Sequence, residues 1–378
     1  MKSNYRRIGD YIREVTVKNK ELNVNTLMGI NIDKYFMLSV ANTVGTDMSK
    51  YKIVKKGQFA CNRMHVGRDK RLPVSLLKEH ESIIVSPAYT VFEIIDEKIL
   101  NSEYLMMWFS RKEFDREAWF YTDSDVRGGL GLDDFFNIEI PVPSIEKQLE
   151  IVEEYNTILD RIDLNEQMVS KLESLIQLIY EYTFKCEKDD EEDLEKYIET
   201  NPKISLKKGM ITKHIEMSQL RVNSMVIDGY EERQFNGGSK FNQFDTLLAR
   251  ITPCLENGKT AFVNCLNNDE IGTGSTEFIV MRAKKDISPY WVYCVARDKE
   301  FRKYAISSMV GSSGRQRVHE DYLKTYKLKR VDIDNMKKFH DRVVGLFDFI
   351  KIKSLERNKL YDIKEILLAR IAIMEEGN

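Results

Sequence analysis

The sequence lacks several features that define common protein classes. Its five cysteines form no C-x-x-C pair, and their odd number argues against a disulfide framework and a structural zinc site. No apolar run approaches the about 18 residues needed to span a bilayer. The first residues, MKSNYRRIGDYIREV, contain no apolar core of a signal peptide. We therefore expect a protein of the reducing cytoplasm that contacts no membrane.

Catalytic signatures are also missing. The sequence contains neither an H-E-x-x-H nor a G-x-S-x-G motif, and its five histidines are scattered. ENGKT (256–260) resembles the end of a Walker A loop, but Pro253 takes the place of the required first glycine. NPKI (201–204) departs from the NPP-aromatic signature of amino-methyltransferases. We expect no catalytic residues, no metal and no cofactor in this chain; the alternative is a site built from residues distant in sequence.

The near-neutral net charge of −2 excludes a uniformly basic protein but conceals segregation along the chain. Residues 1–80 contain 16 Lys and Arg against 7 Asp and Glu, and residues 201–330 contain 22 against 14. The intervening segments 81–140 and 141–200 are acidic, with balances of −8 and −11. Two basic segments indicate two anion-binding faces, although charged faces that are merely solvated would give the same pattern.

Four sequence blocks repeat at an offset near 187, which indicates an internal duplication. GQFACNRM (57–64) aligns with FDTLLARI (244–251), which places Arg63 on Arg250 and Gln58 on Asp245. The other pairs are SPAYTVFEI with STEFIVMRA, NSEYLMMWF with ISPYWVYCV, and LDDFFNIEI with HEDYLKTYK. Their aromatic and β-branched runs are typical of short strands. Chance similarity between two α/β domains is the alternative.

Each repeat ends in a long helical segment. Residues 145–184 contain no glycine or proline, and apolar residues recur there at heptad spacing with Asn165 as the one polar break. The C-terminal segment repeats the pattern at an offset of 188, with Lys353 at the place of Asn165. This period predicts two helices that pair as a coiled coil, with ordinary amphipathic core helices as the alternative. The expected seam consists of Ile151, Tyr155, Ile158, Ile162, Val169, Leu172, Ile176 and Ile179 in the first helix and Phe339, Val343, Leu346, Ile350, Leu360 and Leu367 in the second.

The two basic segments carry side chains suited to DNA. Lysine holds phosphates, whereas Arg, Asn and Gln also hydrogen-bond base edges. The candidates in the first segment and its loop are Lys55, Lys56, Asn62, Arg63, His65, Arg68, Lys70, Arg71 and Arg127. Those in the second segment, including the Gly/Ser loop GSSGRQR (311–317), are Arg250, Asn257, Lys259, Ser312, Ser313, Arg315, Gln316 and Arg317. A surface charge without function is the alternative for each arginine.

Taken together, these features resemble the specificity subunit of type I restriction-modification systems. The resemblance extends over essentially the whole chain and rests on IEIPVPSIEKQLEIVEEYNTILDRIDLNEQMVSKLESL (138–175), KKGQFACNRMHVG (55–67), SPAYTVFEI and GSTEFIVMR (274–282). The most distinctive cue is P-x-P followed by Gln at the start of the long helix. The second helix follows KLKRVDIDNMKKF, which lacks both the proline pair and the Gln.

The resemblance implies an α+β fold in which two duplicated mixed α/β target-recognition domains are separated by two long antiparallel coiled-coil helices. The corresponding divisions are a first domain at 1–144, a first helical spacer at 145–184, a second domain at 185–330 and a second helical spacer at 331–378. Each domain would read one half of a split site in double-stranded DNA, and the helices would set the separation of the halves.

The resemblance also implies partners: two methyltransferase (modification) subunits and a restriction/translocase subunit. S-adenosylmethionine and ATP would then belong to those partners. Two alternatives of other classes are a restriction-modification fusion enzyme with its own catalytic site and a coiled-coil adaptor without DNA contact. Binding of S-adenosylmethionine by the isolated chain would favour the first, and absence of sequence-specific DNA binding would favour the second.

Overall fold

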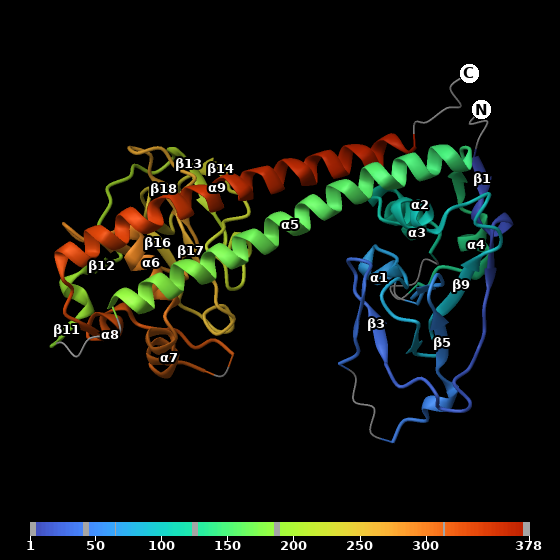
Figure 1. The fold of residues 1–378 in the computed structure, drawn as a ribbon, viewed down its shortest axis with the longest axis horizontal. Coiled ribbons are helices and arrows are strands. Elements are labelled where there is room, and N and C mark those ends of the chain that lie inside the picture. Colours follow the sequence, from blue (N-terminus) through green and yellow to red (C-terminus); the bar gives the residue numbers. More distant parts are fainter. Residues whose placement is uncertain are drawn as a thin grey trace. The chain divides into compact units, whose positions relative to one another are not determined.

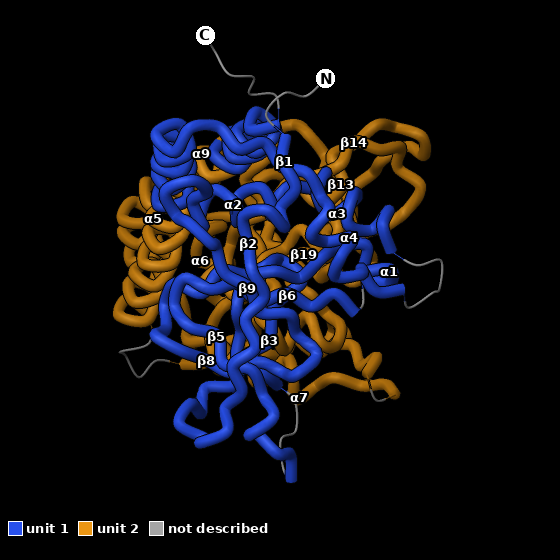
Figure 2. The backbone as a smooth tube through the Cα atoms, turned by 90° about the vertical axis from the view of Figure 1, so that its right-hand side faces the viewer, with its two compact units in different colours: residues 1–161, 360–378 blue, residues 162–359 orange. Residues whose placement is uncertain are grey.

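The computed structural model describes residues 5–40, 45–64, 66–122, 128–184, 190–312 and 314–372 (Figure 1). His65, Arg127 and Ser313, three of the expected DNA contacts, lie outside these described residues. The chain forms two compact units: unit 1 is Met1–Arg161 with Leu360–Asn378, and unit 2 is Ile162–Lys359 (Figure 2).

Two long helices occupy the segments where the heptad pattern predicts them. Helix α5 extends over Ile145–Phe184 and helix α9 over Ile333–Arg370. The start of α5 packs with the end of α9 inside unit 1, and the end of α5 packs with the start of α9 inside unit 2. The helices are therefore antiparallel, and each contributes to both units.

Unit 1 is built around the four-stranded antiparallel sheet β2-β9-β6-β7. The pairs β1-β10, β3-β4 and β5-β8 accompany it. The strands are β1 Tyr5–Arg7, β2 Ile12–Glu14, β3 Met28–Ile30, β4 Phe36–Leu38, β5 Lys52–Lys55, β6 Phe59–Cys61, β7 Val74–Leu76, β8 Ser82–Val85, β9 Thr90–Ile94 and β10 Glu139–Pro141. The short helices are α1 Val66–Asp69, α2 Ser102–Phe109, α3 Lys112–Phe120 and α4 Leu132–Asn137.

Unit 2 contains a sheet of the same order, β12-β19-β16-β17, and a second sheet, β14-β13-β18-β15. The strands are β11 Glu191–Asp193, β12 Ile198–Thr200, β13 Ile211–Ile215, β14 Glu231–Gln234, β15 Ser239–Phe241, β16 Thr246–Ala249, β17 Thr260–Phe262, β18 Gly272–Gly274, β19 Phe278–Ala283 and β20 Lys327–Lys329. The helices are α6 Pro289–Arg297, α7 Lys299–Ser307 and α8 Glu320–Lys324. Strands β11 and β20 pair as β1 and β10 do in unit 1.

The duplication expected from the sequence is confirmed by the strand register. Phe59 lies opposite Phe92 in unit 1, and Thr246 lies opposite Met281 in unit 2. Gln58 Nε2 donates to Glu93 Oε2 at 2.7 Å, and at the aligned positions Arg282 Nη2 donates to Asp245 Oδ2 at 2.6 Å. The same strand-to-strand link is thus made by different side chains, so this contact is kept without sequence identity at these positions.

A further repeat joins α3 and α7, which the four sequence blocks did not include. Both helices begin with Lys-Glu-Phe, and both phenylalanines, Phe114 and Phe301, are fully buried. Phe114 packs against Phe109 with ring centroids 4.9 Å apart, and Phe301 packs edge-on against Tyr326 at 5.2 Å. The aromatic side chain at the third helical position therefore anchors each helix to its unit.

The start of α5 is fixed by Gln148, the residue that makes the helix-start cue distinctive. Its side chain is fully buried; Nε2 donates to the carbonyls of Ile99 and Pro143, and Oε1 accepts from the Asn101 amide at 2.8 Å. Helix α9 lacks this glutamine, and there Asp332 Oδ1 accepts from the Asn335 amide at 2.8 Å. An acidic cap of this kind satisfies one of the free N–H groups of a helix start.

Substitution of Phe114 or Phe301 tests whether each anchor stabilises its own unit. Replacing either by alanine removes a buried ring, and a loss of about 3–5 kcal/mol in the free energy of unfolding is expected. Hydrogen exchange followed by mass spectrometry should show the loss mainly in the unit that carries the change. Lys303→Ala, on the exposed side of α7, should change stability by less than about 0.5 kcal/mol; equal destabilisation of both units by one phenylalanine variant would contradict independent anchoring.

Candidate nucleic-acid interface and helix seam

Arg63 follows strand β6 and is held tightly by the fold of unit 1. Its Nε donates to Thr90 Oγ1 at 2.9 Å, and its Nη1 donates to the carbonyl of Leu130. The Leu130 amide in turn donates to the Arg63 carbonyl at 2.9 Å. The guanidinium thus ties the segment around Leu130 to the end of β6, and this leaves fewer of its donors for a ligand.

Arg250 occupies the equivalent place in unit 2 but is bonded differently. The Val318 amide donates to the Arg250 carbonyl at 2.9 Å, as the Leu130 amide does to Arg63. However, Arg250 Nε is buried and has no hydrogen-bond partner among the described residues. The side chain lines a pocket of about 290 Å³ together with Asn201, Ser239 and Lys240. Buried polar groups are normally hydrogen-bonded, so the two equivalent arginines differ: the Nε of Arg63 donates to Thr90, and that of Arg250 is enclosed without a partner among the described residues.

The other candidates of unit 1 divide between the two ends of β6. Lys55 and Lys56 precede the strand and are exposed, whereas the remaining described candidates follow it. Asn62 Oδ1 accepts from the Met64 amide at 3.1 Å, and Arg68 pairs with Asp69 at 2.7 Å. Beyond them, Lys70 lies 4.7 Å from the centroid of the Trp119 ring, and Arg71 pairs with Asp33 at 3.1 Å. Residues 62–71, excluding His65, are named the basic loop below.

In unit 2, the Gly/Ser loop lies next to Arg250. Arg317 pairs with Ile251 in a β-bridge, and the carbonyl of Gln316 accepts from the Thr252 amide at 3.1 Å. Arg317 Nη2 also donates to Glu277 Oε1 at 2.7 Å, and the hydrogen bonds from Arg317 lower the pKa of the Glu277 carboxyl. The structure therefore brings Arg250, Gln316 and Arg317 together.

The remaining candidates of unit 2 are placed less uniformly. Ser312 and Arg315 are exposed at the tip of the loop, where the Arg315 amide donates to the Ser312 carbonyl at 3.0 Å. Asn257 is exposed in the turn after Pro253. Lys259 directs its Nζ to the carbonyl of Met217 at 2.7 Å, which makes it part of the internal bonding of the unit.

The expected seam residues lie on the inner faces of α5 and α9 to different degrees. Those that are buried are Ile151, Tyr155, Ile162, Ile176, Phe339, Val343 and Ile350. Those that are partly buried are Ile158, Val169, Leu172, Ile179, Leu346, Leu360 and Leu367. Further buried residues that the heptad pattern did not single out are Val152, Tyr180, Phe347, Leu368 and Ile371. The buried face is wider than a two-helix seam because each helix also packs against the core of its unit; Phe347, for example, lies 5.0 Å from Phe262 and 4.5 Å from Tyr290 between ring centroids.

A polar layer interrupts the helix pair inside unit 2. Asn165 of α5 is 2% exposed and Arg357 of α9 is 4% exposed, and both line one pocket with Lys353. Arg357 Nη2 donates to Asp228 Oδ1 at 2.7 Å, which compensates the buried charge. Asn165 Nδ2 has no partner among the described residues. The polar break in the heptad pattern is thus a buried polar layer, with Arg357 rather than Lys353 as its most buried cation.

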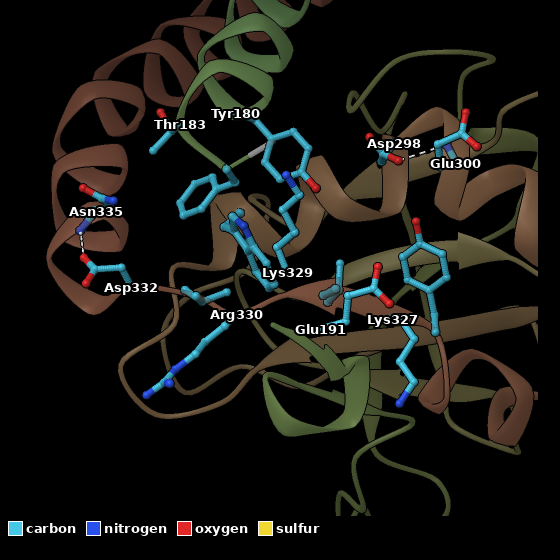
Figure 3. Close-up of a pocket in the computed structure, with 15 residues that line it drawn as sticks. Tyr180, Thr183, Glu191, Asp298, Glu300, Lys327, Lys329, Arg330, Asp332 and Asn335 are labelled. Atoms are coloured by element: carbon cyan, nitrogen blue, oxygen red, sulfur yellow. Dashed lines mark hydrogen bonds between the residues drawn. The ribbon is translucent and has the colours of Figure 1, made fainter. Parts of the chain in front are cut away.

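A pocket of about 290 Å³ lies elsewhere in unit 2, between the end of α5, the start of α9 and strand β20 (Figure 3). Tyr180, Trp291 and Tyr326 supply aromatic walls, and Lys327 and Glu191 supply opposite charges. Trp291 is 2% exposed, and its Nε1 has no hydrogen-bond partner among the described residues. The sequence singled out none of these residues.

No group of three or more His, Cys, Asp or Glu side chains in the described part of the chain is placed to hold a metal ion. No described helix combines the length and apolar character needed to cross a membrane.

Comparison with known proteins agrees with the resemblance seen in the sequence. The chain is 32% identical over 133 residues to the specificity subunit of the type I restriction enzyme EcoAI from Escherichia coli, and 29% identical over 93 residues to that of EcoEI. These matches cover 33% and 24% of this chain but only 22% and 16% of the relatives. The chain thus matches about a fifth of the length of these relatives. No family model matches the sequence.

The fold as a whole also has a solved counterpart. The S subunit of a type I restriction-modification system from M. genitalium superposes with a TM-score of 0.57 at 13% identity, covering 99% of this chain and 96% of that one. At this identity the likeness concerns the fold. The α+β architecture with two duplicated units and two long helices is thereby confirmed.

The polar layer gives a test of the helix pair. Asp228→Ala removes the carboxylate that accepts from both the buried Arg357 and Arg221, and the free energy of unfolding should fall by about 1–3 kcal/mol. Arg357→Met replaces the charge by an apolar chain of similar length and should cost less, because no buried charge is then left unpaired. Urea unfolding measures both variants, with Asp321→Ala as the control because that side chain is 85% exposed. A larger loss in Arg357→Met than in Asp228→Ala would show that the ion pair is not the source of the effect.

Proposed function

We propose that this chain is the DNA sequence-recognition subunit of a type I restriction-modification complex. The single observation that supports this most strongly is the agreement between two curated specificity subunits and a solved S subunit whose fold extends over nearly the whole chain. The two units present cationic side chains at equivalent places after β6 and β16, and this is the arrangement that a reader of two DNA segments requires.

In this proposal each unit reads one half of a bipartite target, and α5 and α9 fix the separation of the halves. Both helices contribute to the cores of both units, which supports a role as a shared frame. The chain itself is non-catalytic. S-adenosylmethionine, ATP and the methyl-transfer and restriction chemistry belong to partner subunits.

The hydrogen bonds and exposure of the candidate residues distinguish the roles that we propose for them. Arg250 is the foremost base-reading candidate because its side chain lines a pocket beside Ser239 and Lys240. Gln316 and the exposed Arg315 lie in the adjoining loop. Arg68, Lys70 and Arg71 of the basic loop hold phosphates. Arg63 positions the basic loop through Thr90 and Leu130 and contributes to DNA binding through that loop.

The proposed docking surface for the methyltransferase subunits is the outer stripe of α5 within unit 2. Five exposed apolar residues recur there at spacings of four, seven, three and four, which places them on one face of a helix. They are Leu164, Met168, Leu175, Leu178 and Tyr182, with exposed fractions from 39% to 76%. An exposed apolar stripe of this length is typical of a protein-interaction surface.

The two equivalent arginines should respond differently to substitution. Arg250→Ala is expected to lower the affinity for the specific site by about 1–3 kcal/mol with little change in folding, because a base contact is lost. Arg63→Ala should lower stability as well as affinity, since two internal hydrogen bonds are removed. Titrations of labelled duplexes at fixed salt, together with thermal unfolding, measure both effects. Unchanged affinity and specificity in Arg250→Ala would remove this residue from the interface.

Exchange of one recognition unit tests the bipartite reading. Residues 1–144 are replaced by the same unit of a relative that has a different target, and both long helices are retained. Methylated bases are then mapped in DNA from cells that express the hybrid with its methyltransferase partner. Only one half of the methylated sequence should change, and the gap should keep its length. A change in both halves would contradict independent reading by the two units.

A further inference from the structure

Three consecutive aromatic side chains at the end of α3 are exposed. Trp119 is 41% exposed, Phe120 80% and Tyr121 44%. The same helix buries Phe114 completely, so its apolar face toward the core is already filled. Contiguous exposed apolar surface marks an interaction site more often than a single exposed residue does. These three residues are named the α3 aromatic cluster.

The backbone at the end of α3 is linked by hydrogen bonds to the basic loop. The Trp119 carbonyl accepts from Thr122 Oγ1 at 2.7 Å and from the Thr122 amide at 3.1 Å. Thr122 forms a β-bridge with Leu130, whose amide donates to the Arg63 carbonyl. A continuous chain of hydrogen bonds thus connects the backbone at Trp119 to the backbone at Arg63. The rings of Phe120 and Tyr121 also contact each other edge-on, with centroids 5.5 Å apart.

The charge around the cluster selects the kind of partner. Lys70 Nζ lies 4.7 Å from the centroid of the Trp119 ring, a cation–π distance. Arg68 and Arg116 are 60% and 72% exposed on the neighbouring helices α1 and α3, each beside one carboxylate. Aromatic rings interleaved with cations fit a polyanion that also offers flat apolar faces, because bases stack on the rings while phosphates meet the cations.

We propose that the α3 aromatic cluster stacks on bases of the bound DNA, with Phe120 as a wedge that enters the base stack and Lys70 beside the adjoining phosphate. This inference rests on the proposed function and adds a contact that reads the deformability of the DNA rather than base edges. Phe120 is the wedge because it is the most exposed ring and has no polar group to satisfy. A wedge also suits a complex whose partner methyltransferase must extrude its target base from the duplex.

The second unit has no counterpart of the cluster. The shared Lys-Glu-Phe start aligns α3 with α7 at an offset of 187, which places Ile306, Ser307 and Ser308 at the positions of the three aromatic residues. The wedge is therefore confined to the half-site read by unit 1, and the two halves of the target are distorted unequally.

The test uses the chain assembled with its methyltransferase partner and duplexes that carry 2-aminopurine at successive positions of each half-site. Apart from the base that a methyltransferase subunit extrudes, fluorescence should rise at one step of the unit 1 half-site and at no step of the unit 2 half-site, because 2-aminopurine brightens when it is unstacked. Phe120→Ala should abolish this rise and weaken binding about 5- to 100-fold, the range found when a base-stacking ring is truncated. Phe120→Trp should restore both.

The controls separate this inference from the proposed function. Tyr322→Ala, which removes an aromatic side chain that is 51% exposed in unit 2, should leave binding and fluorescence unchanged. If the wild-type complex shows no sequence-specific binding, the proposed function itself fails. If it binds specifically but Phe120→Ala binds equally well, or the wild type gives no fluorescence rise, the wedge is overturned while DNA recognition stands. Loss of methyltransferase assembly in Phe120→Ala would assign the cluster to a protein partner and would also overturn the wedge.

Discussion

The packing of aromatic and aliphatic side chains between α5, α9 and the globular cores is the interaction on which the rest of the structure depends. In unit 1 the cluster of Ile151, Tyr155 and Leu368 joins the helices to the sheet of that unit. In unit 2 the rings of Phe262, Tyr290 and Phe347 lie 4.5–5.5 Å apart between centroids. Since burial of one such side chain contributes on the order of 2 kcal/mol, the helices stabilise the units as well as connecting them.

Duplication has preserved the backbone of this arrangement more strictly than its side chains. The carbonyls of Arg63 and Arg250 accept equivalent hydrogen bonds from the amides of Leu130 and Val318. The guanidinium of Arg63 also donates to the Leu130 carbonyl, whereas the Nε of Arg250 has no hydrogen-bond partner among the described residues. The α3 aromatic cluster likewise exists in one unit and not in the other. Two units with one scaffold therefore present different surfaces, and in the proposed function this is the physical basis for reading two unlike DNA segments.

The sequence allowed prediction of the parts that depend on local pattern. The first long helix lies at 145–184 as expected because the absence of glycine and proline and the heptad period act within a few turns. The shared offset of the blocks likewise identified the duplicated sheets. Contacts between distant residues could not be predicted from the sequence. The hydrogen bonds of Arg63 to Leu130 and of Arg357 to Asp228, for example, join residues 67 and 129 positions apart. The exposure of Phe120, in a helix that buries Phe114 six residues earlier, likewise depends on how α3 meets the sheet.

The division of the chain has a consequence for synthesis. Unit 2 is one contiguous stretch, whereas unit 1 combines the first part of the chain with its last residues. Tyr5 donates a hydrogen bond from its hydroxyl to the carbonyl of Ala372 at 2.9 Å, and Leu368 and Ile371 lie in the same core as Ile8. Domains usually fold in the order in which they leave the ribosome. Here the unit that emerges first lacks part of its core until residues 360–372 have also been made, whereas all residues of the second unit precede residue 360. A released chain that ends at Lys359 would retain all residues of the second unit and would leave the first unit without the residues that complete its core.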